Sequence, residues 1–218
     1  MSVAVRVIGV DESGKGDFFG PLVIAALLAS DADQDRLRSL GARDSKLVAD
    51  SRALAIDEML REEFSHAVVV ISPSEYNRRY QQIRNLNKLL AAGHAEVIDR
   101  LALQSGADQA ISDKFGKPEL IEGELAKRGQ NIPLRQLTGG EAIAQVAAAS
   151  ILARAEFIRQ MDAMSQKFAV DFPKGAAAQV DQAGRTFVRI HGEAALSQVA
   201  KLHFKNYQRV VQSRLAGS

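Results

Sequence analysis

Residues 3–29 read VAVRVIGVDESGKGDFFGPLVIAALLA, which is two apolar runs joined by a polar, glycine-bearing turn. The first run, residues 3–10, is rich in valine and isoleucine, a composition typical of a β-strand. The second run, residues 21–29, is almost entirely apolar, as expected for a buried strand. The two runs can pair as a hairpin, and the turn between them, residues 11–20, then carries the polar groups.

Strands and helices alternate along the rest of the chain. The longest helical run, residues 141–168, has an apolar face, and its Ala-Ala-Ala-Ser stretch is small enough to lie close against a sheet. The alternation predicts an α/β fold with a mixed central sheet flanked by helices and a helical C-terminal extension. We expect the core to span residues 1–170, with residues 171–218 packed on the same domain. The expected elements are helices at residues 33–40, 49–64, 73–80, 87–104, 119–128 and 141–168, and strands at residues 66–71, 108–112 and 133–137.

The composition excludes several classes of protein. The chain has 218 residues, 46% of them apolar and 25% charged, which suits one globular domain. It has no cysteine, so disulfides and cysteine-ligated zinc sites are excluded. The N-terminus lacks the pattern of a signal peptide, and no apolar run approaches the roughly 18 residues of a membrane span. We therefore expect a cytoplasmic protein with no membrane partner.

The charge is unevenly distributed, although the net charge is only +2. From residue 171 to the end, seven basic residues stand against three acidic ones, so this segment is basic and the rest is slightly acidic. A nuclease can use such an arrangement, because basic groups bind phosphates while carboxylates bind metal ions. A solvated helical surface is the simpler explanation of the charges alone. The basic residues are Lys174, Arg185, Arg189, Lys201, Lys205, Arg209 and Arg214.

The turn must first be compared with a phosphate-binding loop. Gly9, Gly14 and Lys15 match the pattern G-x-x-x-x-G-K, but the next residue is Gly16, where such a loop has Ser or Thr. A strand-like run follows where a helix is required, and two carboxylates inside the loop would repel phosphates. These departures argue against a nucleotide triphosphatase.

The second interpretation gives the acids of the turn a function. Asp11 and Glu12 end an apolar run, and acidic residues are rare near buried positions unless they are paired or bind a metal. Mg²⁺ and Mn²⁺ prefer such oxygen ligands. Gly14 and Gly16 have no side chains, so a nucleic-acid backbone can approach closely. The structural alternative is a polar turn with an acidic cap.

Two further acids stand at the ends of expected elements. Asp113 follows a short strand-like run, and Glu141 opens the long helical run after two glycines. Both also have structural explanations, Asp113 as a turn residue and Glu141 as a favourable charge at a helix N-terminus. The histidines are scattered without zinc spacing, and we interpret them as structural or surface residues: His66, His94, His191 and His203.

At this point the chain resembles a known family. Asp-Glu-Ser-Gly-Lys-Gly-Asp-Phe-Phe-Gly-Pro, residues 11–21, is similar to the opening motif of type 2 ribonucleases H, and within them of ribonuclease HIII. The resemblance covers nearly the whole chain. Further motifs follow in the family's order, namely residues 44–46 (Asp-Ser-Lys), 85–87 (Asn-Leu-Asn) with His94, 113–115 (Asp-Lys-Phe), 147–154 (Ala-Ala-Ala-Ser-Ile-Leu-Ala-Arg), 172–175 (Phe-Pro-Lys-Gly) and 200–206 (Ala-Lys-Leu-His-Phe-Lys-Asn).

The resemblance implies a ribonuclease H-like fold and a metal-dependent endonuclease. Four acids surround two Mg²⁺ or Mn²⁺ ions in the family, and the matching positions are Asp11, Glu12, Asp113 and Glu141. Asp11 is expected to bridge both ions. Glu141 is preferred to Glu156, which lies beyond the Ala-Ser block, although the two glycines before Glu141 leave a one-residue shift open. The implied reaction is hydrolysis of the RNA strand of an RNA/DNA hybrid, leaving 5′-phosphate and 3′-hydroxyl ends.

Other positions are expected to contact the hybrid. The backbone of residues 14–16 is the expected sensor of the 2′-hydroxyl groups that distinguish RNA from DNA. Three of the basic residues, Lys46, Arg154 and Lys174, have equally good explanations as surface or packing residues. The full expected set is Ser13, Gly14, Lys15, Gly16, Lys46, Arg154 and Lys174.

Two departures from the family pattern bear on substrate choice. Ribonuclease HIII usually carries an N-terminal substrate-binding domain, and here the first motif begins at residue 9, so we expect that domain to be absent. Ribonuclease HII usually has a tyrosine where this chain has Ala176. We therefore expect a monomeric, HIII-like enzyme. Cleavage at single embedded ribonucleotides and a catalytically inactive hybrid-binding module are the alternatives.

Overall fold

The structure is a computed structural model that describes residues 4–42 and 48–212. The chain forms two compact units, each made of several segments. The first comprises Met1–Ser13, Val23–Val69 and Asn85–Glu156, and the second comprises Gly14–Leu22, Val70–Arg84 and Phe157–Ser218. The expected division at residue 170 stays a prediction. Lys46 lies outside the described residues.

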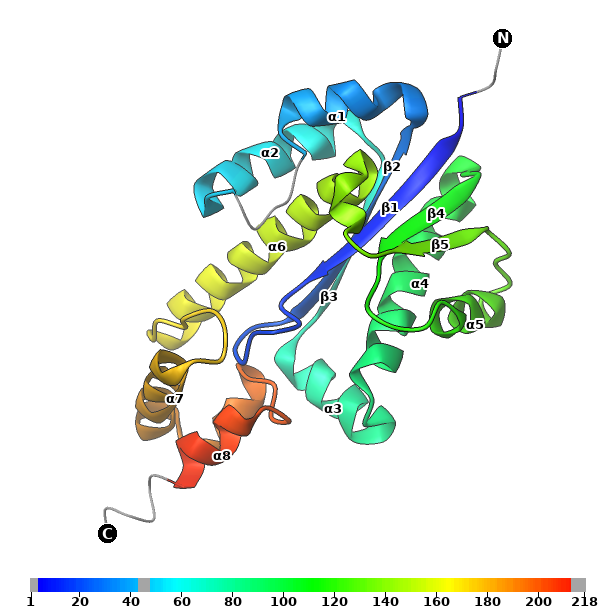
Figure 1. Ribbon diagram of the computed structural model, residues 1–218. Helices are drawn as coiled ribbons and strands as arrows, with labels where there is room; N and C mark the ends of the chain where they lie inside the picture. The colour runs from blue at the N-terminus through cyan, green and yellow to red at the C-terminus, as the bar shows by residue number, and fades with distance from the viewer. Residues whose placement is uncertain (1–3, 43–47, 213–218) are drawn as a thin grey trace. The chain divides into compact units, whose positions relative to one another are not determined.

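A five-stranded sheet forms the centre of the first unit (Figure 1). Its strand order is β3-β2-β1-β4-β5. Strand β1 pairs antiparallel with β2, with Ser13 opposite Val23 at one end, and this confirms the hairpin. Strand β4 runs parallel to both β1 and β5, so the sheet is mixed as predicted. The strands are β1 (Arg6–Ser13), β2 (Leu22–Ser30), β3 (His66–Ile71), β4 (Gln109–Asp113) and β5 (Leu134–Leu137).

Helices pack on both faces of the sheet in the first unit, because successive residues of a strand point to opposite faces. Gly9 of β1 meets the start of α6 (Ala144–Phe168), and a Cβ there would lie 2.2 Å from the main-chain carbon of Gln145. On the other face, α4 (Leu86–Ser105) brings Gly93 against β2, where a Cβ would lie 2.6 Å from Ile24 Cδ1. Two glycines therefore allow both helices to approach the sheet closely.

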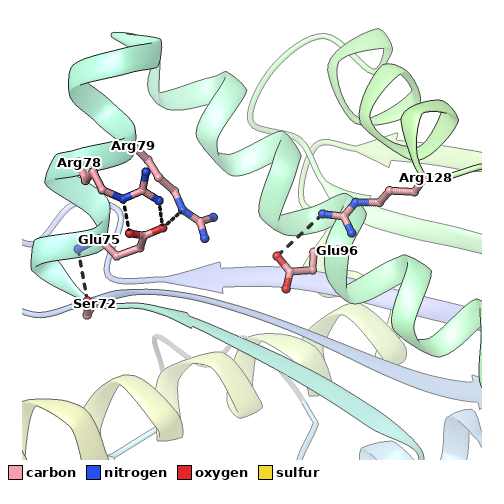
Figure 2. Close-up of polar contacts among 6 residues, drawn as sticks. All are labelled: Ser72, Glu75, Arg78, Arg79, Glu96 and Arg128. Atoms are coloured by element: carbon pink, nitrogen blue, oxygen red, sulfur yellow. Dashed lines mark hydrogen bonds and ion pairs between the residues drawn. The ribbon is translucent and has the colours of Figure 1, made fainter.

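Other helices complete the first unit. The C-terminal end of α5 is connected to α4 by Arg128, which forms ion pairs with Glu96 at 3.9 Å (Figure 2) and Asp99 at 3.7 Å. Helix α4 begins at the cap residue Asn85, whose side chain accepts a hydrogen bond from the Lys88 main-chain N–H. The remaining elements are η1 (Asp31–Asp33), α1 (Gln34–Leu40), α2 (Asp50–Glu63), α5 (Glu119–Lys127) and η3 (Gly140–Ala142).

The second unit contains α3 (Pro73–Ile83), α7 (Ala178–His191), η4 (Glu193–Gln198) and α8 (Lys205–Gln212). Ser72 caps α3 by accepting from the Glu75 N–H, and the Glu75 carboxylate in turn accepts from Arg78 and Arg79 (Figure 2). These two hydrogen-bonded arginines hold the pKa of Glu75 near 2. Because α3 has a proline at its first position and a capping serine before it, its start follows from local sequence.

A buried lysine organises the loop that follows β1 in sequence. Lys201 is fully buried, and its Nζ donates to the carbonyl oxygens of Asp17 at 2.8 Å, Phe19 at 3.4 Å and Gly20 at 2.7 Å. The Phe18 N–H donates to the carbonyl of Gly175 at 2.9 Å, and the Gly175 N–H donates to Asp17 Oδ1. Residues 17–20 are therefore fixed by segments from the C-terminal part of the chain.

The predicted class, an α/β fold with a mixed sheet, flanking helices and helices in the C-terminal part, is confirmed. The long helix starts at Ala144 rather than at residue 141, because Gly140–Ala142 form a short 3₁₀ helix first, preceded by the cap residue Gly139 with φ +70°. No helix within residues 4–42 and 48–212 is long and apolar enough to cross a membrane.

Candidate active site

Three of the four expected acids stand at neighbouring strand ends in the first unit. Strands β1 and β4 are parallel, and their register pairs Val10 with Ser112. The residues that follow, Asp11 and Asp113, therefore lie side by side, and Glu12 comes next on β1. Pairing of the two strands, rather than the sequence positions, brings these carboxylates together.

Asp11 is half-buried in a negatively charged environment. Burial and the charge of Glu12 raise the pKa of Asp11 to about 7, and the charge of Asp113 adds to the rise. Two hydrogen bonds oppose it: the Glu12 N–H donates to Asp11 Oδ1 at 2.8 Å, and the Ser150 side chain donates to the carboxylate. The ionised form of Asp11 is therefore unfavourable in this environment.

Glu12 points to the other face of the sheet, toward α4. Its Oε2 lies 3.0 Å from Nε2 of His94, whose ring is fully buried. On the opposite side of the ring, Nδ1 lies 3.1 Å from the hydroxyl of Ser112. His94 thus connects the end of β1 with the end of β4.

Asp113 is held by the turn that precedes Glu141. The Gly140 N–H donates to Asp113 Oδ1 at 2.9 Å, and a Cβ at Gly140 would lie 3.0 Å from the Asp113 Cα. A side chain at residue 140 would therefore require the backbone of Asp113 to shift by a few tenths of an ångström. Glu141 itself is half-buried in η3, where it directly follows this glycine.

The acids do not converge on one point. Among residues 4–42 and 48–212, no three His, Asp or Glu side chains are grouped so that they hold a metal ion together. The alternation of β1 accounts for part of this, because Asp11 faces α6 and Ser150 whereas Glu12 faces α4 and His94. Metal binding therefore requires adjustment of these side chains.

The glycines of the turn differ in their surroundings. Gly14 has φ +85°, and a Cβ there would lie 2.2 Å from the Pro21 carbonyl oxygen, so this position requires glycine. Gly16 is exposed, and nothing lies within 4 Å of its missing Cβ. Lys15 between them is exposed, and Ser13 at the end of β1 is half-buried. The backbone at Gly16 is thus open to a ligand.

The basic residues expected at the substrate have different surroundings. Arg154 forms an ion pair with Asp50 at 2.8 Å, while Lys174 is exposed. In the basic C-terminal segment, Lys201 is buried and Arg209 pairs with Asp181 at 2.6 Å. Lys201 and Arg209 therefore have partners within the protein, which reduces the positive surface expected from the charge count.

Comparison with known proteins decides the family. The sequence model for the family described as Ribonuclease HII matches residues 8–207, which is nearly the whole chain. The chain belongs to this family. The prediction of a type 2 ribonuclease H is thereby confirmed, and membership makes the chain a ribonuclease H, an endoribonuclease and hydrolase.

Relatives named Ribonuclease HIII are among the most similar proteins. The one from Chlamydia felis is 42% identical over 96% of this chain and 71% of its own length. A crystal structure of Bst-RNase HIII in complex with Mn²⁺ superposes with a TM-score of 0.90 at 32% identity, covering 96% of this chain and 70% of that one. Aquifex aeolicus RNase H3 superposes with a TM-score of 0.76 at 27% identity, covering 91% and 72%. The likeness to HIII within the ribonuclease H family is confirmed.

Sequence reasoning missed three polar residues of this ribonuclease H. It interpreted His94 as a structural or surface residue, yet His94 contacts Glu12. It used Ser150 only for its small size, yet the hydroxyl of Ser150 is bonded to Asp11. Ser112 was assigned to a strand without a role. The one available signal was the place of His94 and Ser150 inside motifs that the family shares.

Proposed function

We propose that this ribonuclease H hydrolyses the RNA strand of RNA/DNA hybrids, leaving 5′-phosphate and 3′-hydroxyl ends. The observation that carries the proposal is Asp11, a half-buried carboxylate beside Glu12 and Asp113 whose pKa is raised to about 7. Ionisation of such a group destabilises the folded protein unless a cation is bound. Relief of this destabilisation favours the binding of a divalent metal ion. The oxygen-only donors fit Mg²⁺ or Mn²⁺.

Asp11, Glu12, Asp113 and Glu141 are the residues that would hold two divalent ions. Ions of this kind lower the pKa of a bound water and stabilise the charge of a departing oxygen. A relative whose structure contains Mn²⁺ supports this assignment. The chain's own contribution is to orient the ligands: Ser150 holds Asp11, and the Gly140 N–H holds Asp113.

The turn after the acids provides the contact to the nucleic acid. Gly14 follows Glu12 by two residues, and the backbone at Gly16 is not covered by neighbouring atoms. Main-chain groups at these positions can reach 2′-hydroxyls, which only the RNA strand carries. Ser13, Lys15, Arg154 and Lys174 are assigned to the same substrate, with Arg154 first released from Asp50.

Substrate choice is inferred to be HIII-like. Ala176 has only a methyl group where HII enzymes have a tyrosine, and its carbonyl already accepts from Asn206 at 3.0 Å. An aromatic ring stacked on a base is worth roughly 1–3 kcal/mol, and Ala176 cannot supply it. Cleavage within runs of ribonucleotides is therefore preferred over cleavage at one ribonucleotide. A monomeric, cytoplasmic enzyme completes the proposal.

The deciding experiment uses one labelled RNA/DNA hybrid and the matching DNA duplex. Wild-type protein with Mg²⁺ or Mn²⁺ is expected to cut only the RNA strand, and Asp11→Asn is expected to be at least about a thousandfold slower. The product ends are read by phosphatase sensitivity and by ligation. Cleavage that persists in EDTA would refute the metal mechanism. Hybrid binding by the wild type without cleavage in either metal would leave the inactive binding module instead.

A further inference from the structure

One histidine joins two of the acidic strand ends in the first unit. His94 comes from α4, is fully buried, and contacts Glu12 Oε2 at 3.0 Å and the Ser112 hydroxyl at 3.1 Å. The Phe115 ring lies against it, with a distance of 4.7 Å between ring centroids. An imidazole packed in this way has one orientation, so the direction of its Nε2 toward Glu12 is fixed.

The hydrogen bonds of Ser112 determine how the ring is used. The Ser112 hydroxyl donates its only proton to the carbonyl oxygen of Asp113 at 2.9 Å. It therefore accepts from His94, and Nδ1 carries a proton. Nε2 is left for the carboxylate of Glu12, which it contacts at 3.0 Å. This contact restrains the Glu12 side chain.

The two contacts together span neighbouring strands. Glu12 lies on β1, while Ser112 and the carbonyl of Asp113 lie on β4. The ring therefore sets the direction of the Glu12 carboxylate relative to the strand end that carries Asp113. A partner that orients a metal ligand in this way typically changes metal affinity 10–100-fold when it is removed.

We propose that His94 is a positioning residue, which restrains the Glu12 carboxylate at the end of β1 and so limits the adjustment that divalent metal binding requires of it. The inference rests on the proposed function, because it takes Glu12 as a metal ligand. The inference still makes a claim of its own, which is that loss of the hydrogen bond between His94 and Glu12, and not loss of packing volume, weakens metal binding. Asn77, which is also buried, has its polar atoms bonded to Ser197, Ala200 and Leu202 and has no comparable link to an acid.

Two isosteric substitutions separate the contacts. The amide of glutamine reaches about as far as Nε2 of histidine, so His94→Gln keeps a donor for Glu12. The amide of asparagine reaches only about as far as Nδ1, so His94→Asn keeps the Ser112 contact and loses Glu12. His191→Asn is the matched control, because His191 is exposed and its hydrogen bond is to the carbonyl of Phe168, not to an acid.

The measurement is Mn²⁺ binding to purified, substrate-free protein, followed by the electron paramagnetic resonance signal of free Mn²⁺. We expect His94→Asn to bind Mn²⁺ about 10–100-fold more weakly than wild type. We expect His94→Gln to lie within about threefold of wild type, by retention of the hydrogen bond. Saturating Mn²⁺ should restore most of the kcat of His94→Asn on a hybrid. Ser112→Ala keeps the His94 ring but removes its second hydrogen-bond partner, so its Mn²⁺ affinity should lie between those of wild type and His94→Asn. This variant replaces His94→Asn in the test if His94→Asn does not fold.

The outcomes are distinguishable. Unchanged Mn²⁺ binding by His94→Asn, or equal weakening by the asparagine and glutamine variants, would refute the positioning role while leaving the proposed function intact. Wild-type protein that neither binds Mn²⁺ nor cleaves a hybrid would refute the proposed function and this inference with it. Weakened binding by His191→Asn would show that the effect is not specific to His94 and would also refute the inference.

Discussion

Replacement of Asp11 by asparagine should stabilise the metal-free protein at alkaline pH while it removes the activity. The pKa of Asp11 is 3.8 in an unfolded chain and about 7 in the folded protein. Because the folded value is higher, the folded state binds more protons between these values, and the ionised group costs stability as pH rises. The cost is absent below pH 3.8, grows through the interval and is complete above about pH 7.

The size of the effect follows from the shift. A rise of about three pKa units corresponds to about 4 kcal/mol at most, at 1.36 kcal/mol per unit. Asparagine has nearly the same shape, and its oxygen can still accept from the Glu12 N–H. Asp11→Asn should therefore raise the free energy of unfolding by about 2–4 kcal/mol at pH 8.5, and by about 1–2 kcal/mol at pH 5.

Urea unfolding in EDTA at the two pH values measures this difference. Asp162→Asn, which changes an exposed carboxylate on α6, is the matched control and should change stability little. Added Mn²⁺ should then stabilise the wild type and not the variant. If Asp11→Asn is no more stable than the wild type at pH 8.5, the carboxylates are not in electrostatic conflict, and the argument for a cation at this site fails.

Three further predictions test the assignment of the site and the substrate. Glu141→Gln should be severely impaired in hybrid cleavage, while Glu156→Gln should be nearly normal; the reverse pattern would mean that the fourth ligand is misplaced. A full RNA strand paired with DNA should give a higher kcat/KM than a duplex of equal length with one ribonucleotide, and equal or better cleavage of the latter would make the enzyme functionally HII-like. KM for the hybrid should rise steeply with salt because phosphate contacts release counterions, and a flat dependence would exclude the basic residues from binding.

The hairpin and the positions of the acids could be predicted because they depend on local patterns. An apolar run that ends in Asp11 and Glu12 fixes which residues reach the strand end, and the parallel register with β4 then places Asp113 beside them. The start of α6 was less predictable. Gly139 and Gly140 look like a simple helix start, but Gly140 is used to approach Asp113.

The roles of His94 and Lys201 depend on long-range packing, which no local pattern contains. Side chains of β1 alternate between the two faces of the sheet, which α4 and α6 cover. Whether Glu12 meets α4 or α6 therefore depends on which face its side chain occupies. A histidine at an apolar helical position is compatible with both a core role and a site role. Lys201 was counted with the basic surface of the C-terminal segment, although it is fully buried. Composition cannot reveal such burial, because lysine is seldom buried.

The buried Lys201 also determines when residues 17–20 can become ordered during folding. During synthesis residues 17–20 are made before Lys201, whose ammonium group bonds three of their carbonyls and which follows Asp17 by 184 positions. Contacts of such long separation form late in folding, since the intervening chain must first be ordered. The segment that directly follows Asp11 and Glu12 therefore obtains its anchor only after Lys201 has been made. A chain that ends before Lys201 would contain Asp11, Glu12, Asp113 and Glu141 and still lack this support for residues 17–20.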